Sequence, residues 1–287
     1  MIDAISPLRP MTEHLDADVR RIEADSPIAH LHLASVDALL GGLRDRLSVI
    51  AAKPGAGKTT LLISILDDAA RDGIPCVLFE EELSRRSVLS KSLVRLSGGL
   101  LTTGDLEGHQ GGEKARALGE AVARYREEIA PRMYIVDGPT GLRDMDRCVS
   151  EVAEAHGRPP VVGVDYVQIV PMPPELQSIE ERVSLRLVLG GLHDLATRYG
   201  CPVFALSSIN RTGYAKAKPS MDNLGGSSYI EYGSDVVIGL SRDKNDDGAR
   251  GAEQRVTLAT LKHRYGPCGS VRLVFDGARA TFYEVGR

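Results

Sequence analysis

The stretch Ala51-Ala52-Lys53-Pro54-Gly55-Ala56-Gly57-Lys58-Thr59-Thr60 decides the fold of this 287-residue chain. It follows an apolar run at residues 47–51, which predicts a buried strand, and it precedes apolar spacing at residues 61–70, which predicts a helix. A strand, a glycine loop ending in Gly-Lys-Thr and a helix together form the pattern of a phosphate-binding loop. One position departs from the pattern, because Ala52 stands where the first glycine is usual.

The chemistry of this loop predicts a nucleotide site with ATP and Mg²⁺ as ligands. Small residues let backbone N–H groups surround the phosphates, and the helix N-terminus adds partial positive charge. We expect Lys58 to reach the β- and γ-phosphates and Thr59 to hold Mg²⁺. The predicted nucleotide-binding residues are Lys53, Pro54, Gly55, Ala56, Gly57, Lys58, Thr59 and Thr60. The alternative is a glycine-rich turn before an ordinary helix.

Composition argues against several other classes of protein. The net charge of −4 gives no overall basic field for nucleic acid, although a local basic loop could still bind it. The cysteines lack metal or disulfide spacing, so we expect buried thiols; they are Cys76, Cys148, Cys201 and Cys268. No apolar stretch approaches the ~20 residues of a membrane span, and the N-terminus does not resemble a signal peptide. The sequence predicts a soluble, cytoplasmic protein.

Alternating strand and helix patterns predict the α/β class. Strands near residues 76–79, 133–136, 160–164 and 202–206 alternate with helical segments, so we expect a mostly parallel central sheet with helices on both faces. From residue 236 onward, four strand patterns follow one another with short turns, which predicts an antiparallel extension at the sheet edge.

We divide the chain into an N-terminal arm at residues 1–32 and a domain at residues 33–287. A sparse apolar stripe at residues 12–24 predicts a short helix, which would need to pack on its own domain or on a neighbouring subunit.

Two strand ends supply candidate catalytic acids. Asp165 ends the apolar run 161–164, where open α/β sheets place ligands, and it is the predicted second Mg²⁺ residue. Glu82 is the candidate that polarises the attacking water. Glu80 and Glu81 compete for that role, since strand alternation separates only odd positions from even ones.

Later segments add hydroxyl groups and cations. Ser207 and Ser208 follow another strand and could sense a γ-phosphate. The predicted DNA-binding residues Arg211, Lys216 and Lys218 lie on one loop, where they suit the phosphates of single-stranded nucleic acid or form a solvated surface.

A basic turn follows the strand pattern near residue 260. Its cations Lys262 and Arg264 are two residues apart and point to the same side. They could reach a phosphate across a subunit boundary as an arginine finger, or simply belong to a basic β-turn.

Several of these segments together resemble DnaB-type replicative helicases. Residues 52–59 match the phosphate loop of that family, which often carries alanine at the first position. Phe79-Glu80-Glu81-Glu82-Leu83-Ser84 is similar to its strand-Glu-Met motif, and this likeness favours Glu82 over its neighbours. Val164-Asp165-Tyr166-Val167-Gln168 resembles its Asp-Tyr-Leu-Gln box.

The resemblance continues to the end of the chain. Ala205-Leu206-Ser207-Ser208-Ile209-Asn210-Arg211 is similar to the family's Ala-Leu-Ser-Gln-Leu-Asn-Arg stretch, and residues 227–243 follow its next segment. Lys262-His263-Arg264-Tyr265-Gly266-Pro267 resembles its Lys-Gln-Arg-Asn-Gly-Pro turn. The order and spacing hold over roughly residues 35–283.

The resemblance implies a RecA-like P-loop ATPase core in a hexameric ring, with ATP between subunits and single-stranded DNA in the centre. It implies that Lys262 and Arg264 contact the neighbour's γ-phosphate. This sequence departs from the family at Ser208, where the family has a phosphate-sensing glutamine, and at Gly225-Gly226-Ser227, where it has Arg-Glu-Ser. The alternatives are a recombination- or clock-type RecA ATPase, or a regulatory nucleotide-binding protein without unwinding activity.

Overall fold

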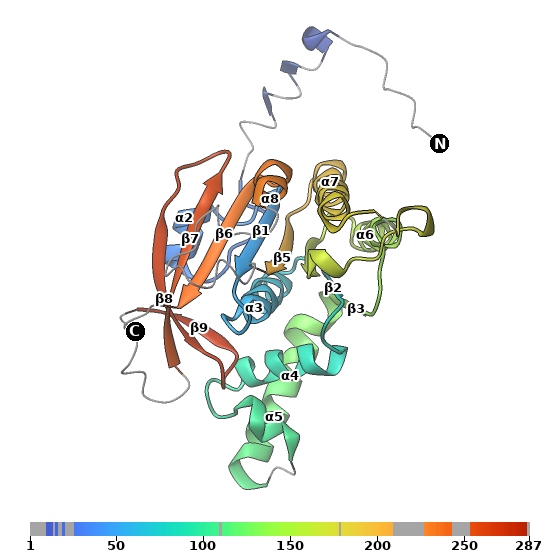
Figure 1. Ribbon diagram of the computed structural model, residues 1–287. Helices are drawn as coiled ribbons and strands as arrows, with labels where there is room; N and C mark the ends of the chain where they lie inside the picture. Colours follow the sequence, from blue (N-terminus) through green and yellow to red (C-terminus); the bar gives the residue numbers. More distant parts are fainter. Residues whose placement is uncertain are drawn as a thin grey trace.

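A computed structural model describes residues 10–13, 15–16, 19–20, 26–108, 111–177, 179–208, 227–242 and 253–285. Within these residues one nine-stranded sheet, in the order β3-β2-β4-β5-β1-β6-β7-β8-β9, runs through the molecule (Figure 1). The predicted α/β class is confirmed.

The first six strands form the parallel part of the sheet. They are β1 (Leu47–Ala52), β2 (Cys76–Glu80), β3 (Met133–Asp137), β4 (Val161–Asp165), β5 (Val203–Ser208) and β6 (Val236–Arg242). Strand β1 lies at the centre of the whole sheet, with parallel partners β5 and β6 on its two sides. The carboxyl ends of these strands therefore share one edge of the sheet.

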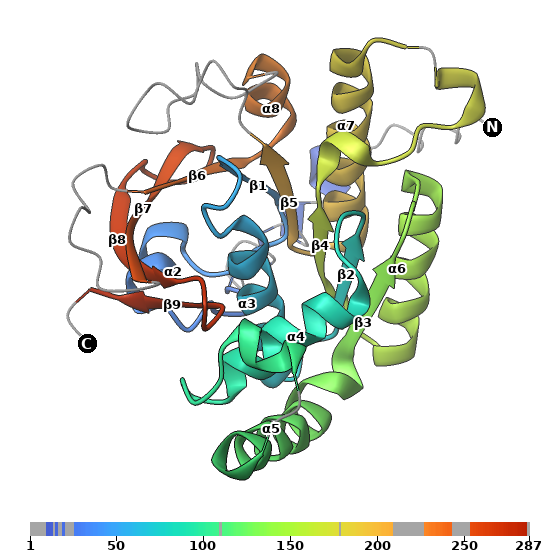
Figure 2. The same cartoon turned by 60° about the horizontal axis from the view of Figure 1, so that its bottom comes forward.

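The last three strands form the antiparallel extension: β7 (Glu253–His263), β8 (Ser270–Asp276) and β9 (Thr281–Glu284). The fourth strand predicted for this extension, at residues 236–240, is β6, and its pairing with β1 is parallel. Strand β6 joins the two parts, because it pairs in parallel with β1 and antiparallel with β7. Strands β8 and β9 curve toward the helix that follows the phosphate loop, as Figure 2 shows from below.

Helices cover both faces of the sheet, as predicted. One side carries α2 (Ala34–Leu40), α3 (Lys58–Arg71), α4 (Arg85–Leu96) and α5 (Gly112–Arg124); the other carries α6 (Leu142–His156), α7 (Glu181–Tyr199) and α8 (Ser227–Gly233). Strand alternation separates the two cores: Ile50 and Ala52 pack toward α3, whereas Val49 and Ala51 pack toward α7. Shorter helical turns are Met11–Glu13, Thr103–Glu107, Tyr125–Ile129, Ala130–Arg132, Val167–Ile169 and Pro174–Leu176.

Some expectations need correction. Cys268 is exposed and Cys148 is half-buried, so only Cys76 and Cys201 are buried thiols. Helix α2 was not predicted, because its seven residues carry only two buried apolar side chains. Much of the predicted helix at residues 12–24 lies outside the described residues; Met11–Glu13 is a single 3-10 turn.

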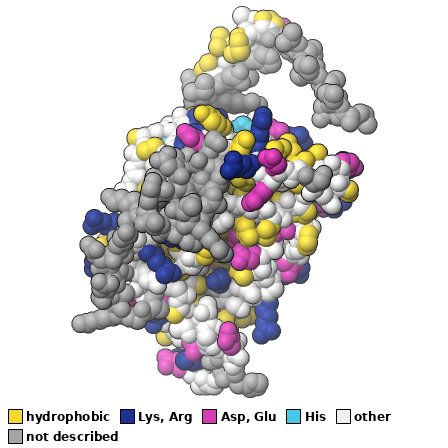
Figure 3. Space-filling model, in the orientation of Figure 1, with side chains coloured by type: hydrophobic (Ala, Val, Ile, Leu, Met, Phe, Trp, Pro, Cys, Tyr) yellow, Lys and Arg dark blue, Asp and Glu magenta, His cyan; other side chains and the backbone are white. Residues whose placement is uncertain are grey.

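The distribution of charged side chains on the surface is consistent with the modest net charge. Acidic and basic side chains of the described residues are interspersed over the face that Figure 3 shows. Among the described helices, none has the length and apolar composition needed to cross a membrane.

Candidate active site

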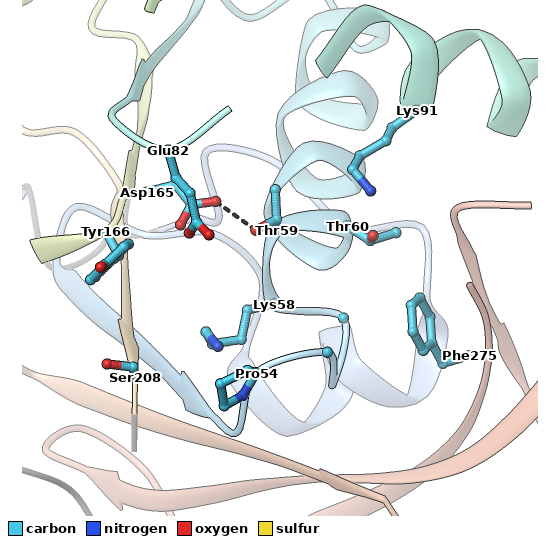
Figure 4. Close-up of a pocket in the computed structure, with 12 residues that line it drawn as sticks. Pro54, Lys58, Thr59, Thr60, Glu82, Lys91, Asp165, Tyr166, Ser208 and Phe275 are labelled. Carbon is cyan, nitrogen blue, oxygen red and sulfur yellow. Dashed lines mark hydrogen bonds between the residues drawn. The ribbon is translucent and has the colours of Figure 1, made fainter. Parts of the chain in front are cut away.

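The phosphate loop opens into a cleft of about 460 Å³ at the carboxyl ends of β1 and β4 (Figure 4). Its lining residues are Pro54, Gly55, Gly57, Lys58, Thr59, Thr60, Glu82, Lys91, Asp165, Tyr166, Ser208 and Phe275. Six of the eight predicted loop residues therefore face the cleft. The other two do not line it: Ala56 is buried, and Lys53 is half-buried.

Gly57 is required by the backbone and by its neighbours. Its φ is +96°, a left-handed conformation that favours glycine. A Cβ atom there would lie 2.8 Å from Phe282 Cζ and 3.1 Å from Phe275, which stack on each other with ring centroids 4.7 Å apart. The antiparallel extension thus braces the phosphate loop from the side.

Lys58 begins α3 with its ammonium group held over the loop. Nζ donates to the carbonyl oxygens of Ala52, at 3.1 Å, and Lys53, at 3.4 Å. Burial lowers the pKa of Lys58 from its ordinary value, and the carboxylates of Asp165 and Glu82 oppose that shift. The cation is therefore already partly desolvated where a phosphate would meet it.

Thr59 and Asp165 are joined by a short hydrogen bond in the cleft. Thr59 Oγ1 donates to Asp165 Oδ2 at 2.6 Å, as Figure 4 marks. Asp165 is buried, and burial raises its pKa while the Thr59 hydrogen bond lowers it. A hydroxyl and one carboxylate suit Mg²⁺, which binds proteins through few carboxylates and takes other oxygens from phosphates and water. The described residues contain no cluster of three His, Cys, Asp or Glu side chains that could hold a metal alone.

The structure separates the three glutamates that follow the apolar part of β2. Glu82 is exposed and faces the cleft beside Asp165 (Figure 4). Glu81 turns away, and its Oε1 accepts a hydrogen bond from the Thr140 amide at 2.9 Å. Glu80 is fully buried. Of the three, only Glu82 lines the cleft.

Sequence reasoning missed Lys91 of α4, whose side chain points into the cleft near Thr60 (Figure 4). Burial lowers its pKa, while the carboxylates of Asp165 and Glu80 raise it. Among the described residues, none forms a hydrogen bond or ion pair with its ammonium group. A signal was available, because Lys91 is spaced three and four residues from Val88 and Arg95, on the inward face of α4.

The structure does not bring Lys262 and Arg264 to the cleft of the same subunit. Lys262 Nζ donates to the Ser234 carbonyl oxygen at 2.6 Å and to that of Glu231. Arg264 Nη1 donates to Asp235 Oδ1 at 3.0 Å. These partners lie at the end of α8 and the start of β6, so both cations occupy the sheet edge opposite the phosphate loop.

Of the remaining predicted residues, the two serines at the end of β5 are described by the structure and the DNA-binding residues are not. Ser208 lines the cleft at the end of β5, and the neighbouring Ser207 hydroxyl accepts a hydrogen bond from Gln168 Nε2 at 2.7 Å. The predicted DNA-binding residues Arg211, Lys216 and Lys218 lie outside the described residues.

Comparison with known proteins gives a family match over nearly the whole chain. The model of the DnaB-like helicase C-terminal domain matches residues 30–284. The replicative DNA helicase DnaB of Treponema pallidum is 31% identical over 270 residues, which cover 87% of this chain and 54% of that protein. The Leifsonia xyli protein of the same name is 28% identical, with 96% of this chain and 61% of that protein covered. The chain thus spans a little over half the length of these relatives.

Solved structures agree on the fold. One solved ATPase domain superposes with a TM-score of 0.84 at 20% identity, covering 96% of this chain and 99% of that domain. A DnaB-like replicative helicase, described together with its interactions with primase, gives a TM-score of 0.82 at 19% identity, covering 98% of this chain and 68% of the other. Both likenesses support the RecA-like architecture.

Proposed function

Because this chain belongs to the family of the DnaB-like helicase C-terminal domain, we propose that it is an ATP-hydrolysing motor of the replicative-helicase type that binds and moves along single-stranded DNA. One observation carries the enzymatic part of this proposal. Thr59 and Asp165 are in contact at 2.6 Å in a cleft that also contains Lys58 and Glu82.

Each of these side chains has a separate role in ATP hydrolysis. Lys58 and the loop amides neutralise phosphate charge, and Glu82 orients the attacking water. Thr59 and Asp165 would hold Mg²⁺, which when bound neutralises charge that develops on the phosphate oxygens. The catalytic effect is mostly electrostatic and positional, because the phosphoryl transfer itself needs little covalent help from the protein.

Lys91 is a second phosphate-binding cation in this proposal. Its ammonium group faces the cleft from α4, on the side away from Lys58 (Figure 4). The cleft contains the carboxylates of Asp165 and Glu82, so two lysines leave it close to neutral before the nucleotide enters. A triphosphate would then gain an ion pair on each side.

Completion of the site requires a neighbouring subunit. We assign Lys262 and Arg264 to the γ-phosphate of the adjacent subunit, since neither cation reaches the loop of its own subunit. This arrangement supports a ring, and the family suggests a hexamer. We assign residues 1–32 to an arm that would contact a neighbouring subunit, and residues 33–287 to the motor domain.

DNA binding is assigned to the loop that contains Arg211, Lys216 and Lys218. Three cations within eight residues suit a phosphate backbone, and their contribution to affinity would fall as salt rises. Replication proteins such as a primase are the partners that this role implies, and a role in DNA replication implies a cytoplasmic location.

The test measures the ATPase rate of the full chain with and without a single-stranded oligonucleotide, alongside its mass in solution. We expect an oligomer whose ATPase is stimulated by DNA and is lost in Lys58→Ala. An ATPase rate that the oligonucleotide does not change at any protein concentration would favour the alternative of a regulatory ATPase. A Lys58→Ala protein that turns over normally would contradict the site itself.

A further inference from the structure

Glu80 is buried at the carboxyl end of β2, although a carboxyl group is costly to remove from water. It shares the face of β2 with Leu78, which packs toward α3 and α4, and it lies opposite Asp165 in the register of β2 and β4. The proposed catalytic roles leave this side chain without a function. Its contacts give it one.

One oxygen of Glu80 binds the next turn of its own chain. Oε1 accepts hydrogen bonds from the amide of Glu82 at 3.1 Å and from the amide of Leu83 at 2.8 Å. The carboxyl group thereby satisfies two donors that follow the strand and have not yet entered a helix. Side chains that bond to amides two and three residues ahead fix the local backbone in this way.

The neighbouring residues fix the rest of the turn. The amide of Glu81 donates to the carbonyl oxygen of Asp165 at 2.9 Å. Ser84 then caps α4, because its side chain accepts a hydrogen bond from the Ser87 amide. Every amide from residue 81 to residue 83 is therefore bound, and two of the three are bound to Glu80.

We propose that Glu80 is a positioning residue that sets the backbone of Glu82, so that the Glu82 carboxylate faces the cleft beside Asp165. This inference rests on the proposed role of Glu82 in orienting water. Glu80 itself touches no reacting atom in this assignment. Displacing a catalytic group by about 1 Å can cost roughly 100-fold in rate, so loss of these two hydrogen bonds should lower kcat well before it lowers nucleotide affinity.

The experiment compares Glu80→Met with Glu80→Gln in the full chain. Methionine fills a similar volume without an acceptor, whereas glutamine keeps an oxygen at the same reach. We expect Glu80→Met to lower kcat by about 10- to 100-fold, with binding of a fluorescent ATP analogue changed less than about threefold. Glu80→Gln should retain kcat within about threefold.

Two further variants make the result decisive. Glu81→Ala alters the same turn without touching the Glu82 or Leu83 amides, and it should retain kcat. Glu80→Ala replaces Glu80→Met if the methionine variant does not fold, since a smaller side chain admits water to the buried amides. Thermal unfolding of each variant shows that the comparison is made on folded protein.

Two outcomes contradict the inference while leaving the proposed function intact. One is a folded Glu80→Met or Glu80→Ala protein with the wild-type kcat. The other is a Glu80→Gln protein as slow as Glu80→Met, because charge rather than an acceptor would then be needed. Glu82→Gln is measured in parallel. Full activity in that variant would overturn both the role of Glu82 and the positioning that depends on it.

Discussion

The polar groups at the two ends of β1 differ in whether they already have partners. At its carboxyl end, the carbonyl oxygen of Ala52 accepts from Lys58, and acidic and basic side chains surround an open cleft. At its amino end, the amide of Leu47 donates to Asp235 Oδ2, and Asp235 also binds Arg264. One edge has an open cleft for a phosphate chain, whereas at the other edge the cations already have partners.

The separation of these ends is the reason that the proposed site includes a second subunit. Five residue steps along β1 span roughly 17 Å, because a strand rises about 3.3 Å per residue. Arg264 is tied to Asp235 at the far end and cannot cover that distance to its own Lys58. In the proposed arrangement, a second copy brings the amino-end cations of one subunit to the carboxyl-end cleft of another.

Removing the ammonium group of Lys58 should give the largest effect. We expect Lys58→Ala to reduce ATP turnover to the background of the assay, because the cation that neutralises the transferred phosphate is lost. Steady-state ATPase checks the rate, and thermal unfolding checks that the protein is folded. Lys114→Ala, on the exposed surface of α5, is the matched control. If both variants hydrolyse ATP equally well, the cleft is not the active site.

Removing the guanidinium group of Arg264, at the opposite edge of the sheet, should give the next largest effect. We expect Arg264→Ala to lower kcat by roughly 10³-fold, the scale of an arginine finger. Nucleotide binding to the isolated subunit should hardly change, since Arg264 does not line that subunit's cleft. If the Arg264→Ala variant, as a dilute monomer, bound nucleotide much more weakly than the wild type, Arg264 would belong to the site of its own subunit. The proposed difference between the two ends of β1 would then be wrong.

A smaller effect is expected at Lys91. Replacing it with methionine keeps the aliphatic packing but removes one charge-assisted contact, so ATP affinity should fall about tenfold. Arg86→Met on the same helix serves as control, because Arg86 is exposed and does not line the cleft. Equal affinities for Lys91→Met and the wild type would remove Lys91 from the phosphate site.

A buried acid at each edge of the sheet gives a further comparison, because replacing it should change the stability of the fold in opposite directions at pH 8. Burial raises the pKa of Glu80 to about 7, above its ordinary value of 4.5. The folded state then holds the proton more tightly, so its stability falls as the pH rises through that window. Glu80→Gln should therefore stabilise the nucleotide-free protein by at most about 3 kcal/mol above pH 7 and by little near pH 4.5. Urea unfolding at pH 5 and pH 8 measures the difference.

Asp235 provides the contrast at the other end. It is buried too, but it accepts from Arg264 and from the Leu47 amide. Asp235→Asn weakens a charge-assisted pair and should destabilise the fold by about 1–2 kcal/mol at pH 8, because Arg264 is partly exposed. Stabilisation of both variants at pH 8 would mean that the two ends do not differ in this way.

The sequence predicted the parallel sheet and the loop well, because both depend on local patterns. Apolar strand runs and the Gly-Lys-Thr spacing need no knowledge of distant contacts. Lys91 was missed because a lysine on the inner face of α4 becomes a cleft residue only when α4 packs beside α3. Spacing alone could not separate the three glutamates, since the turn after β2 changes the strand alternation. Only the family resemblance favoured Glu82.

The spacing of Lys262 and Arg264 could not show which end of the sheet they occupy, although the family resemblance implied a contact with a neighbouring subunit. A basic turn in the sequence has no direction relative to a distant loop. The antiparallel return of β7 along β6, with Lys262 opposite Val237, sends that turn to the amino end of β1. Only the strand order shows that the motif faces away from its own phosphate loop.

The most direct measurement mixes two inactive proteins. The Lys58→Ala protein lacks a working cleft but keeps Arg264, whereas the Arg264→Ala protein keeps the cleft but lacks that cation. A mixed oligomer therefore contains subunit interfaces at which an intact Lys58 faces an intact Arg264. We predict that ATPase activity returns on mixing and is greatest near equal proportions. Activity that stays at background at every ratio, in oligomers shown by native mass spectrometry to contain both variants, would contradict a site shared between subunits.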